Sequence, residues 1–324
     1  MINIETSAPG KVMLAGEYAV LDGAPAICMA VNRRARVSIT SNAEQYHTVS
    51  APGFAEGQQA FAAIAEIADT YPLLAAVWQQ LQFETHDFLD IVLDSSGFND
   101  ATAGKIGIGS SAAMAVALTA ALARLAGAGS DIRSTAMAAH RTLQGGVGSG
   151  ADVACSLHGG IIEYRMGDKQ SRQLRWPAEL SFALLWSGVP ADTRSQLDKL
   201  VGVDAHASRA ELGHTAQAVA QAWQLGDSTA VLHSLREYTE ALRHFDVDHT
   251  LGIFDAGHST LANEADSSDV VYKPCGAGGG DLGIAISTNK SALSTFVKAA
   301  SERGFKLMDL RIDPAGLFEA GNEQ

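Results

Sequence analysis

The segment from Gly104 to Ala113 combines glycines and serines in a pattern that suits the binding of an anion. It reads GKIGIGSSAA and runs into a long alanine-rich stretch. Glycines let the backbone curl and approach a ligand closely. Ser110 and Ser111 would stand at the start of a helix, where free N–H groups and the helix dipole favour a phosphate, and either hydroxyl could ligate Mg²⁺. A serine-capped helix after a glycine turn is the alternative interpretation.

Two well-known nucleotide motifs do not fit the chain. No GxxxxGK[ST] string is present, since Lys11 is followed by Val12 and Lys105 by Ile106. A dinucleotide-binding pattern would need a second strand that ends in an acid, whereas the segment before Asp131 leads into another helix. The dinucleotide interpretation is therefore weak.

Two further glycine loops carry charged residues. The run 273–281, KPCGAGGGD, lies between two expected strands, and ordering so many small residues costs backbone entropy that a plain hairpin does not justify. The run 145–150, GGVGSG, leads into Asp152. An acid at a helix start usually complements the dipole, but here it is also a candidate catalytic carboxylate on a rigid element.

Composition limits the classes of protein to which the chain can belong. It has 324 residues, is 47 % hydrophobic and 18 % charged, and its formal net charge is −13. Such a chain can bury a large core, which excludes wholesale disorder. The acidic balance argues against nucleic-acid or membrane partners, because phosphate affinity needs a broad basic surface. An anionic ligand would require cations concentrated in one cleft.

Cysteine usage and the absence of targeting patterns indicate a cytoplasmic protein. Cys28, Cys155 and Cys275 lie far apart, are odd in number and form no CxxC pair, which is typical of a reduced, disulfide-free chain. The first nine residues contain an acid and no basic residue, unlike a secretory signal. The apolar run 112–123 is too short to span a bilayer.

The hydrophobic pattern predicts alternating strands and helices that place these loops. Strands are expected at 12–21, 26–31, 34–40, 88–94, 160–165, 181–187 and 305–312, with a strand–glycine–strand unit at 270–287. Helices are expected at 58–82 (broken or kinked at Pro72), 110–126, 131–143, 151–157, 193–263 in several stretches, and 291–302. The sequence pattern changes near 168–175, after which long helical stretches with dense charge follow. This change predicts two α+β lobes, at 1–172 and 173–324.

Three of these segments together resemble the GHMP kinase superfamily, named after galactokinase, homoserine kinase, mevalonate kinase and phosphomevalonate kinase. The string SAPGKVMLAGEY at 7–18 is similar to its N-terminal motif, GIGSSA at 107–112 to its phosphate loop, and 276–281 to its third motif. The motifs occur in the family's order. The resemblance implies an α+β fold with an N-terminal ribosomal-protein-S5-like lobe and a C-terminal ferredoxin-like lobe, with ATP and acceptor between them.

Within the superfamily the chain most resembles the phosphomevalonate kinases. Mevalonate kinases usually carry His where this chain has Tyr18, and a Mg²⁺-binding Glu where it has Arg141. The run 144–154 and the Asp281 that ends the third motif are similar to the phosphomevalonate kinase versions. The resemblance implies transfer of the ATP γ-phosphoryl to 5-phosphomevalonate, a step of isoprenoid precursor synthesis.

The resemblance also implies roles for individual residues. Lys11 would lie between the acceptor and the γ-phosphate, Lys105 would contact nucleotide or acceptor phosphate, and Asp152 would orient Lys11 or the metal. The residues expected to bind ATP phosphates are Lys105, Gly107, Ile108, Gly109, Ser110, Ser111 and Ala112. Those expected to bind the acceptor are Tyr18, Ser149, Gly278, Gly279 and Asp281. Mg²⁺ would be held by Ser110 or Ser111.

Several alternatives stay open. Lys273 is as well explained by a solvated position as by the site, most of the Arg33, Arg34 and Arg36 cluster is expected at a solvated strand edge, and His140 is expected to be structural or solvated. A mevalonate kinase or another small-alcohol kinase would use Asp152 as a base. The chain could also be a non-catalytic relative that binds a nucleotide or metabolite, which is a different class of function. A monomer and a homodimer are both compatible with the sequence.

Overall fold

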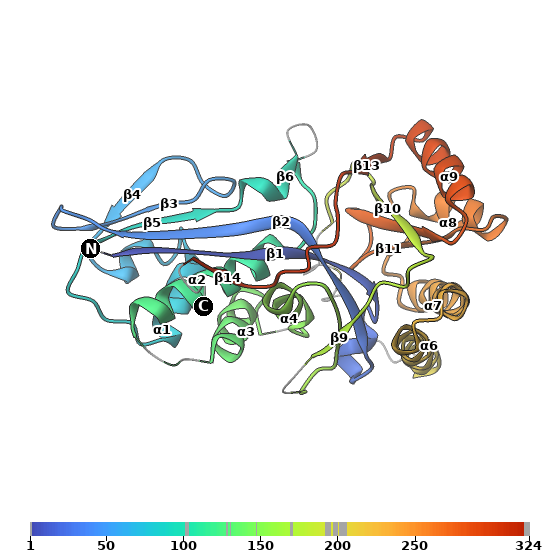
Figure 1. Cartoon of the computed structure of the whole chain (residues 1–324), viewed down its shortest axis with the longest axis horizontal. Coiled ribbons are helices and arrows are strands. Elements are labelled where there is room, and N and C mark those ends of the chain that lie inside the picture. Colours follow the sequence, from blue (N-terminus) through green and yellow to red (C-terminus); the bar gives the residue numbers. More distant parts are fainter. Residues whose placement is uncertain are drawn as a thin grey trace.

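The computed structural model describes residues 2–320 with the exception of 101–103, 128, 130, 147, 169–170, 192–195, 197–199 and 201–205. Figure 1 shows an elongated molecule with two lobes, a larger one that contains both termini and a smaller one that carries the helices labelled α6 to α9. We refer to them as the N-terminal and C-terminal lobes. The predicted lobe boundary between residues 172 and 173 stays a prediction.

The N-terminal lobe is organised around one eight-stranded sheet. Its long central strands, β1 (Asn3–Ala15) and β2 (Ala26–Ser41), pair antiparallel, with a register shift between Pro9 and Gly10. The sheet continues as β14-β1-β2-β5-β3-β4, and β8 and β9 extend it from the other end of β2. The remaining strands are β3 (His47–Ser50), β4 (Gln58–Phe61), β5 (Leu89–Asp94), β8 (Ile161–Tyr164), β9 (Arg172–Leu174) and β14 (Phe318–Glu319).

Four helices cover one face of this sheet (Figure 1). They are α1 (Pro72–Gln80), α2 (Ser110–Leu125), α3 (Ile132–Leu143) and α4 (Ala151–His158). Residues 112–123 of α2 are all buried, because its small alanine side chains let the helix lie close against β1 and β2. A short hairpin, β6 (Asn99–Asp100) with β7 (Gly104–Lys105), precedes α2. The loop 106–109 therefore lies between this hairpin and the buried helix α2.

The C-terminal lobe contains a four-stranded antiparallel sheet in the order β11-β12-β10-β13. Its strands are β10 (Ser181–Trp186), β11 (Val271–Pro274), β12 (Leu282–Ser287) and β13 (Lys306–Met308). Its helices are α6 (His206–Leu225), α7 (Ser228–His249), α8 (His258–Asp266) and α9 (Lys290–Glu302). Every residue of β12 is buried, as expected for a central strand. The connection between β11 and β12 is the glycine run 275–281, which we call the third glycine loop because it comes last of the three along the chain.

The last described residues return to the N-terminal lobe, where β14 pairs with β1. Arg34 on β2 holds this return segment. Its guanidinium forms an ion pair with Asp313 at 2.7 Å and donates to the carbonyls of Ala315 and Gly316. Of the arginine cluster on β2, Arg34 is thus a structural residue rather than a solvated one.

The predicted elements are mostly confirmed, although the strands predicted at 26–31 and 34–40 form a single strand, β2, and three other predictions need correction. The helix predicted at 58–82 is wrong in its first half, which forms β4 and a short 3₁₀ helix, η2 (Ile64–Ile67), so that the helix begins at Pro72. Proline at the first helical position loses no hydrogen bond, which explains a start rather than a break. The strand predicted at 12–21 begins at Asn3 and ends at Ala15, before η1 (Ala19–Asp22). The strand predicted at 305–312 covers only Lys306–Met308, which is β13. The start of the helical stretch predicted from residue 193 lies outside the described residues.

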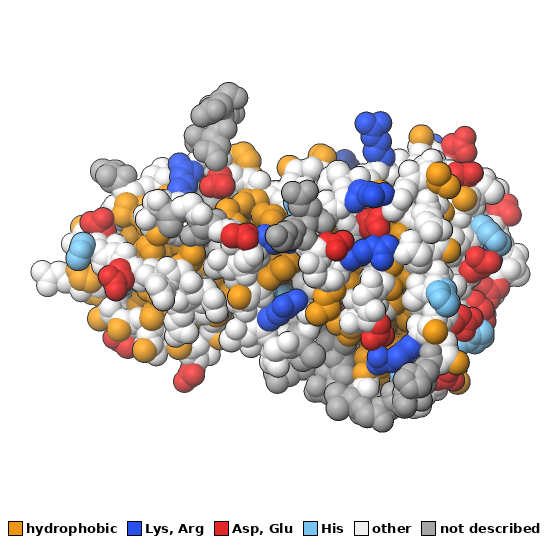
Figure 2. All heavy atoms as spheres, turned by 90° about the horizontal axis from the view of Figure 1, so that it is seen from below, with side chains coloured by type: hydrophobic (Ala, Val, Ile, Leu, Met, Phe, Trp, Pro, Cys, Tyr) orange, Lys and Arg blue, Asp and Glu red, His pale blue; other side chains and the backbone are white. Residues whose placement is uncertain are grey.

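None of the helices in the described ranges is long and apolar enough to cross a membrane. Figure 2 shows acidic and histidine side chains gathered at the α6–α7 end of the face seen from below. There, His233 and His244 lie within 4 Å of glutamates on the same two helices. On this face, basic side chains are interspersed with acidic ones.

Candidate active site in the cleft between the lobes

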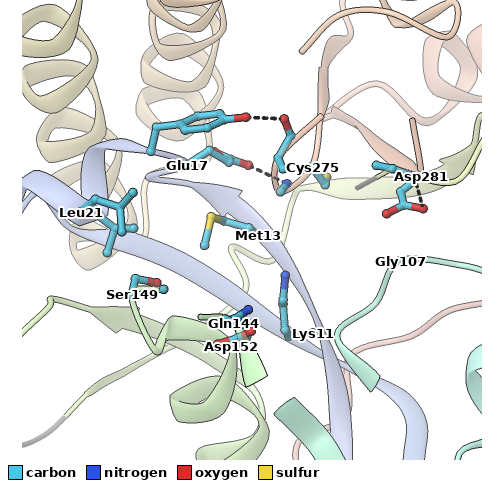
Figure 3. A pocket seen from close by; sticks show the side chains of 16 residues that line it. Lys11, Met13, Glu17, Leu21, Gly107, Gln144, Ser149, Asp152, Cys275 and Asp281 are labelled. Carbon is cyan, nitrogen blue, oxygen red and sulfur yellow. Dashed lines mark hydrogen bonds between the residues drawn. The ribbon is translucent and has the colours of Figure 1, made fainter. Parts of the chain in front are cut away.

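A cleft lies where β1, the start of α4 and the third glycine loop face one another (Figure 3). Its N-terminal-lobe wall carries Lys11, Gln144, Ser149 and Asp152, and its opposite wall carries Glu17, Tyr18 and the loop from Cys275 to Ala277. Met13, Val20 and Leu21 give the cleft an apolar part. The structure thus brings Lys11, Tyr18, Ser149, Asp152 and Asp281 of the predicted site to a single cleft.

Lys11 is held against the phosphate loop by its own backbone. Its N–H donates to the carbonyl of Ile108 at 2.8 Å. This approach requires the neighbouring Gly10, because a Cβ there would lie 2.7 Å from the same carbonyl oxygen. A Cβ on Gly109 would lie 3.1 Å from the Lys11 side chain. The two glycines let the lysine stem run beside the loop, with its amino group directed into the cleft (Figure 3).

The phosphate loop ends at a helix whose first N–H groups have no side-chain cap. Gly109 is the N-cap residue of α2 in the left-handed conformation (φ +75°), and no side chain accepts a hydrogen bond at the cap. Ser110 and Ser111 begin the helix, whereas Ile108 and Ala112 are buried in the core. An uncapped helix start with its positive dipole end is a favourable place for an anion.

Asp152 is the second residue of α4, just as Ser111 is the second residue of α2. Gly150 is the left-handed N-cap residue (φ +84°), and the Asp152 carboxylate accepts a hydrogen bond from the Val153 N–H. The other Asp152 oxygen lies 3.9 Å from His140 Nε2, and that nitrogen is 3.0 Å from Ser111 Oγ. His140 therefore lies between the two helix starts that carry the predicted metal-binding serine and the predicted catalytic acid.

Asp281 closes the third glycine loop over the phosphate loop. Its side chain lies so near Gly107 that a Cβ on this glycine would be 2.2 Å from the carboxyl group. Asp281 has a positive φ of 51° and accepts a hydrogen bond from the Ala191 N–H at 3.2 Å. Burial raises the pKa of this carboxyl, and the hydrogen bond and the charges of Lys105 and Lys11 oppose the rise.

The middle of this loop points away from the cleft. A Cβ on Gly278 would meet the Ile253 backbone, and the Gly279 N–H donates to the Ile253 carbonyl at 2.9 Å. Instead, Gly276 and Ala277 line the cleft, and the Tyr18 hydroxyl donates to the Ala277 carbonyl at 2.5 Å (Figure 3). The predicted roles of Gly278 and Gly279 in acceptor binding stay predictions, and their observed contacts are with the C-terminal lobe.

A second, more apolar cavity also borders the start of α2. Lys105, Ser110, Ser111 and His140 contribute polar groups to its lining. The rest of its lining is contributed mainly by apolar and aromatic side chains: Ala51, Phe54, Tyr71, Pro72, Leu73, Leu74, Leu93, Met114 and Leu143. Gln144 lines both cavities. The cavity thus combines an apolar lining with polar groups at the start of α2.

Lys273 and the cysteines occupy buried positions. The Lys273 side chain, 2 % exposed, forms an ion pair with Glu17 at 2.5 Å, so this lysine is not solvated. The three cysteines are free and buried. Burial raises the pKa of the Cys275 thiol to about 12, so the thiolate is scarce at neutral pH.

Three residues of the site escaped prediction from the sequence. The sequence favours a structural or solvated role for His140, and it predicts no role for Glu17 within the N-terminal motif or for Gln144 at the start of the run 144–154. Each depends on long-range folding that brings α3, the turn after β1 and the cleft together. Gln144 lies four residues after His140, so the helical period offered a signal for pairing them.

The residues present fit a nucleotide phosphate and a divalent cation. The uncapped N–H groups of α2 suit phosphate oxygens, and the hydroxyls of Ser110 and Ser111 are oxygen donors of the kind Mg²⁺ prefers. Asp152 adds a carboxylate nearby. Among the described residues, no cluster of three or more His, Cys, Asp or Glu side chains suits a metal. A metal bound here would therefore take most of its ligands from phosphates and water.

Comparison with known proteins decides the family. The family model for the GHMP kinase N-terminal domain matches residues 73–160, the segment that contains the phosphate loop and Asp152. The chain is 31 % identical to the phosphomevalonate kinase of a Streptomyces species over 336 aligned positions, which cover 86 % of this chain and 88 % of that protein.

The chain is a GHMP kinase.

Other relatives support the same family and fold. A mevalonate kinase of Aeropyrum pernix is 31 % identical over 175 residues, half of each chain. The structure of Streptococcus pneumoniae phosphomevalonate kinase in complex with phosphomevalonate and AMPPNP superposes with a TM-score of 0.79 at 18 % identity, over 96 % of this chain and all of that one. The expected two-lobe α+β GHMP kinase fold is thereby confirmed, and this GHMP kinase is a phosphotransferase.

Proposed function

We propose that this GHMP kinase transfers the γ-phosphoryl group of ATP to the phosphate of 5-phosphomevalonate, which yields 5-diphosphomevalonate and ADP in the mevalonate pathway. The observation that carries the proposal is the similarity to the Streptomyces phosphomevalonate kinase along nearly the whole chain, whereas the mevalonate kinase relative above matches half of it. The cleft supports it, because Lys11 stands beside the phosphate loop where two polyanions would meet.

The chemistry of a phosphate acceptor explains why the cleft needs charge more than a base. A phosphate monoester has a second pKa of about 6, so at pH 7 it is mostly dianionic and already nucleophilic. An acceptor oxygen forms the new bond to the γ-phosphorus as the bond from that phosphorus to the bridging oxygen breaks, and ADP leaves with the electron pair. The main difficulty is to bring two anions together, which favours cations and positioning.

The residues of the cleft divide these tasks between them. Lys11 would neutralise charge between the acceptor and the γ-phosphate, and Lys105 would act on the nucleotide side. The N–H groups at the start of α2 would bind the nucleotide phosphates, and the apolar cavity beside them would hold the base. Mg²⁺, held by the ATP phosphates with Ser110 or Ser111, would supply further charge neutralisation. Asp152 would orient Lys11 or the hydrated metal.

The acceptor itself is the first point to test. ADP release from MgATP should be compared with 5-phosphomevalonate, mevalonate, galactose and homoserine under identical conditions. The proposal predicts turnover with 5-phosphomevalonate and little or none with the three alcohols. Turnover with mevalonate alone would contradict it and make Asp152 a general base. No ADP release with any acceptor would move the function to an untested acceptor or to ligand binding, whereas ADP release independent of acceptor would show transfer of the phosphoryl group to water.

A further inference from the structure

The Glu17 side chain joins three segments at the seam between the lobes. One carboxylate oxygen accepts from the Lys273 ammonium at 2.5 Å and from the Gly276 N–H at 3.3 Å. The other accepts from the Tyr238 hydroxyl on α7 at 2.7 Å. The side chains of Glu17 and Lys273 are 1 % and 2 % exposed. A charged pair so deeply buried is stable only while both partners and their hydrogen bonds remain.

The turn that carries Glu17 is strained. Tyr18 has a φ of +61° and a ψ of −49°, and the Ala19 N–H donates to the Glu17 carbonyl at 2.6 Å, which defines a three-residue turn of the rare, strained kind. Such a conformation persists only where surrounding contacts over-determine it. Here the contacts come from the C-terminal lobe, since Ala277 accepts from the Tyr18 hydroxyl and the Gly16 N–H donates to Tyr238.

The charge of Lys273 is used within this cluster and not at a ligand. Besides Glu17, its ammonium donates to the Pro274 carbonyl at 2.7 Å, and it lies 5.8 Å from the centre of the Tyr238 ring. Glu17 lines the cleft that also holds Lys11. Without Lys273, an unpaired carboxylate would face the place where phosphates meet. Lys273 therefore both fixes Glu17 and cancels its charge.

We infer that Glu17, Lys273 and Tyr238 form a latch between the lobes, and that these three are positioning residues for phosphoryl transfer. The latch sets the distance between the wall that carries Lys11 and the wall formed by Gly276 and Ala277. None of the three transfers a proton or contacts the reacting phosphorus. Only the kinetic test of the latch rests on the proposed acceptor, because the latch itself is defined by contacts within the protein.

The decisive kinetic test is a double-mutant cycle. Lys273→Met leaves Glu17 charged and unpaired, so kcat/KM for the acceptor should fall by about 100-fold, the loss typical of small displacements in an active site. Glu17→Gln should cost less. The double variant, in which neither residue is charged, should recover about tenfold over Lys273→Met. Lys298→Met, an exposed lysine on α9, is the matched control. Additive losses in the double variant would overturn the latch.

Tyr238→Phe and hydrogen exchange keep the inference testable if a charge variant fails to fold. This substitution removes only the hydroxyl that bonds Glu17 and Gly16. Amides of residues 16–19 and 276–281 should exchange several-fold faster than in wild type, while those of α2 stay unchanged, and KM for the acceptor should rise more than kcat falls. Unchanged exchange in both segments would overturn the latch. Exchange needs no acceptor, so this readout stands even if 5-phosphomevalonate is not turned over.

Discussion

Lys11 combines a backbone contact with the phosphate loop and a side chain directed into the cleft. Lys11→Met removes the charge and keeps much of the stem. We expect kcat to fall by at least about 100-fold, as when one transition-state charge partner is lost, while the Kd of a nonhydrolysable ATP analogue changes little. Steady-state kinetics and calorimetric titration measure the two quantities. Near-normal turnover would remove Lys11 from the chemistry, and Lys298→Met controls for a general loss of charge.

The effect of replacing Asp152 should differ between a phosphate acceptor and an alcohol acceptor. With a phosphate acceptor no proton has to be removed, so Asp152→Asn should lower kcat by about tenfold or less, against the 100- to 10,000-fold typical of a lost general base. The variant keeps the shape of the side chain at the start of α4. A rate profile measured from pH 5.5 to 9 completes the test. An essential base titrating near neutrality, absent in the variant, would argue for an alcohol acceptor.

Helix α8 begins with a buried histidine that contacts the third glycine loop. His258, at the start of α8, contacts the Tyr272 hydroxyl at 2.7 Å and the Gly280 carbonyl at 3.0 Å. Nε2 must carry the proton to donate to that carbonyl, so Nδ1 accepts from Tyr272. Burial lowers the pKa of His258 from 6.5 to about 4, although the bond to Gly280 opposes the shift. The ring is neutral whenever the loop is intact at physiological pH.

This pKa predicts an acid-dependent loss of stability. The unfolded state takes up a proton near pH 6.5 and the folded state only near pH 4, so the free energy of unfolding is unaffected above pH 6.5 and falls as pH decreases between these values. The loss attributable to His258 should reach about 3 kcal/mol. Urea unfolding of wild type and His258→Gln at pH 7.5, 5.5 and 4.5 measures it. Parallel pH dependences would show that His258 does not titrate in this way.

At the scale of the whole molecule, the C-terminal return segment ties the end of the chain to its first strand. Arg34→Ala should lower the free energy of unfolding by about 2 kcal/mol, because its hydrogen bonds to Asp313 and to the carbonyls of Ala315 and Gly316 are lost together. Arg36→Ala, an exposed position on the same strand, should change it by about 0.5 kcal/mol at most. If the two variants lowered the free energy of unfolding in urea equally, the contacts of Arg34 with the return segment would not be stabilising the fold.

The sequence predicts local features better than the contacts between distant segments. The helix at 110–125, the strand at 181–186 and the strand–glycine–strand unit follow from periodicity and glycine content, and the structure confirms them. The segment 58–67 was mispredicted because its alanines and isoleucines suit a helix, whereas pairing with β3 makes part of it a strand. Partners such as Glu17 with Lys273, 256 positions apart, leave no signal in a local pattern.

In the proposed reaction the γ-phosphoryl group is transferred to a phosphate and not to an alcohol. The most direct measurement is ³¹P NMR of a reaction that contains MgATP, 5-phosphomevalonate and the full-length enzyme. We predict that the monoester resonance of the acceptor disappears as two mutually coupled diphosphate resonances form, in step with ADP. A monoester signal that persists unchanged while ATP is consumed, or a second uncoupled monoester resonance from transfer to a hydroxyl of the acceptor, would contradict the proposed reaction.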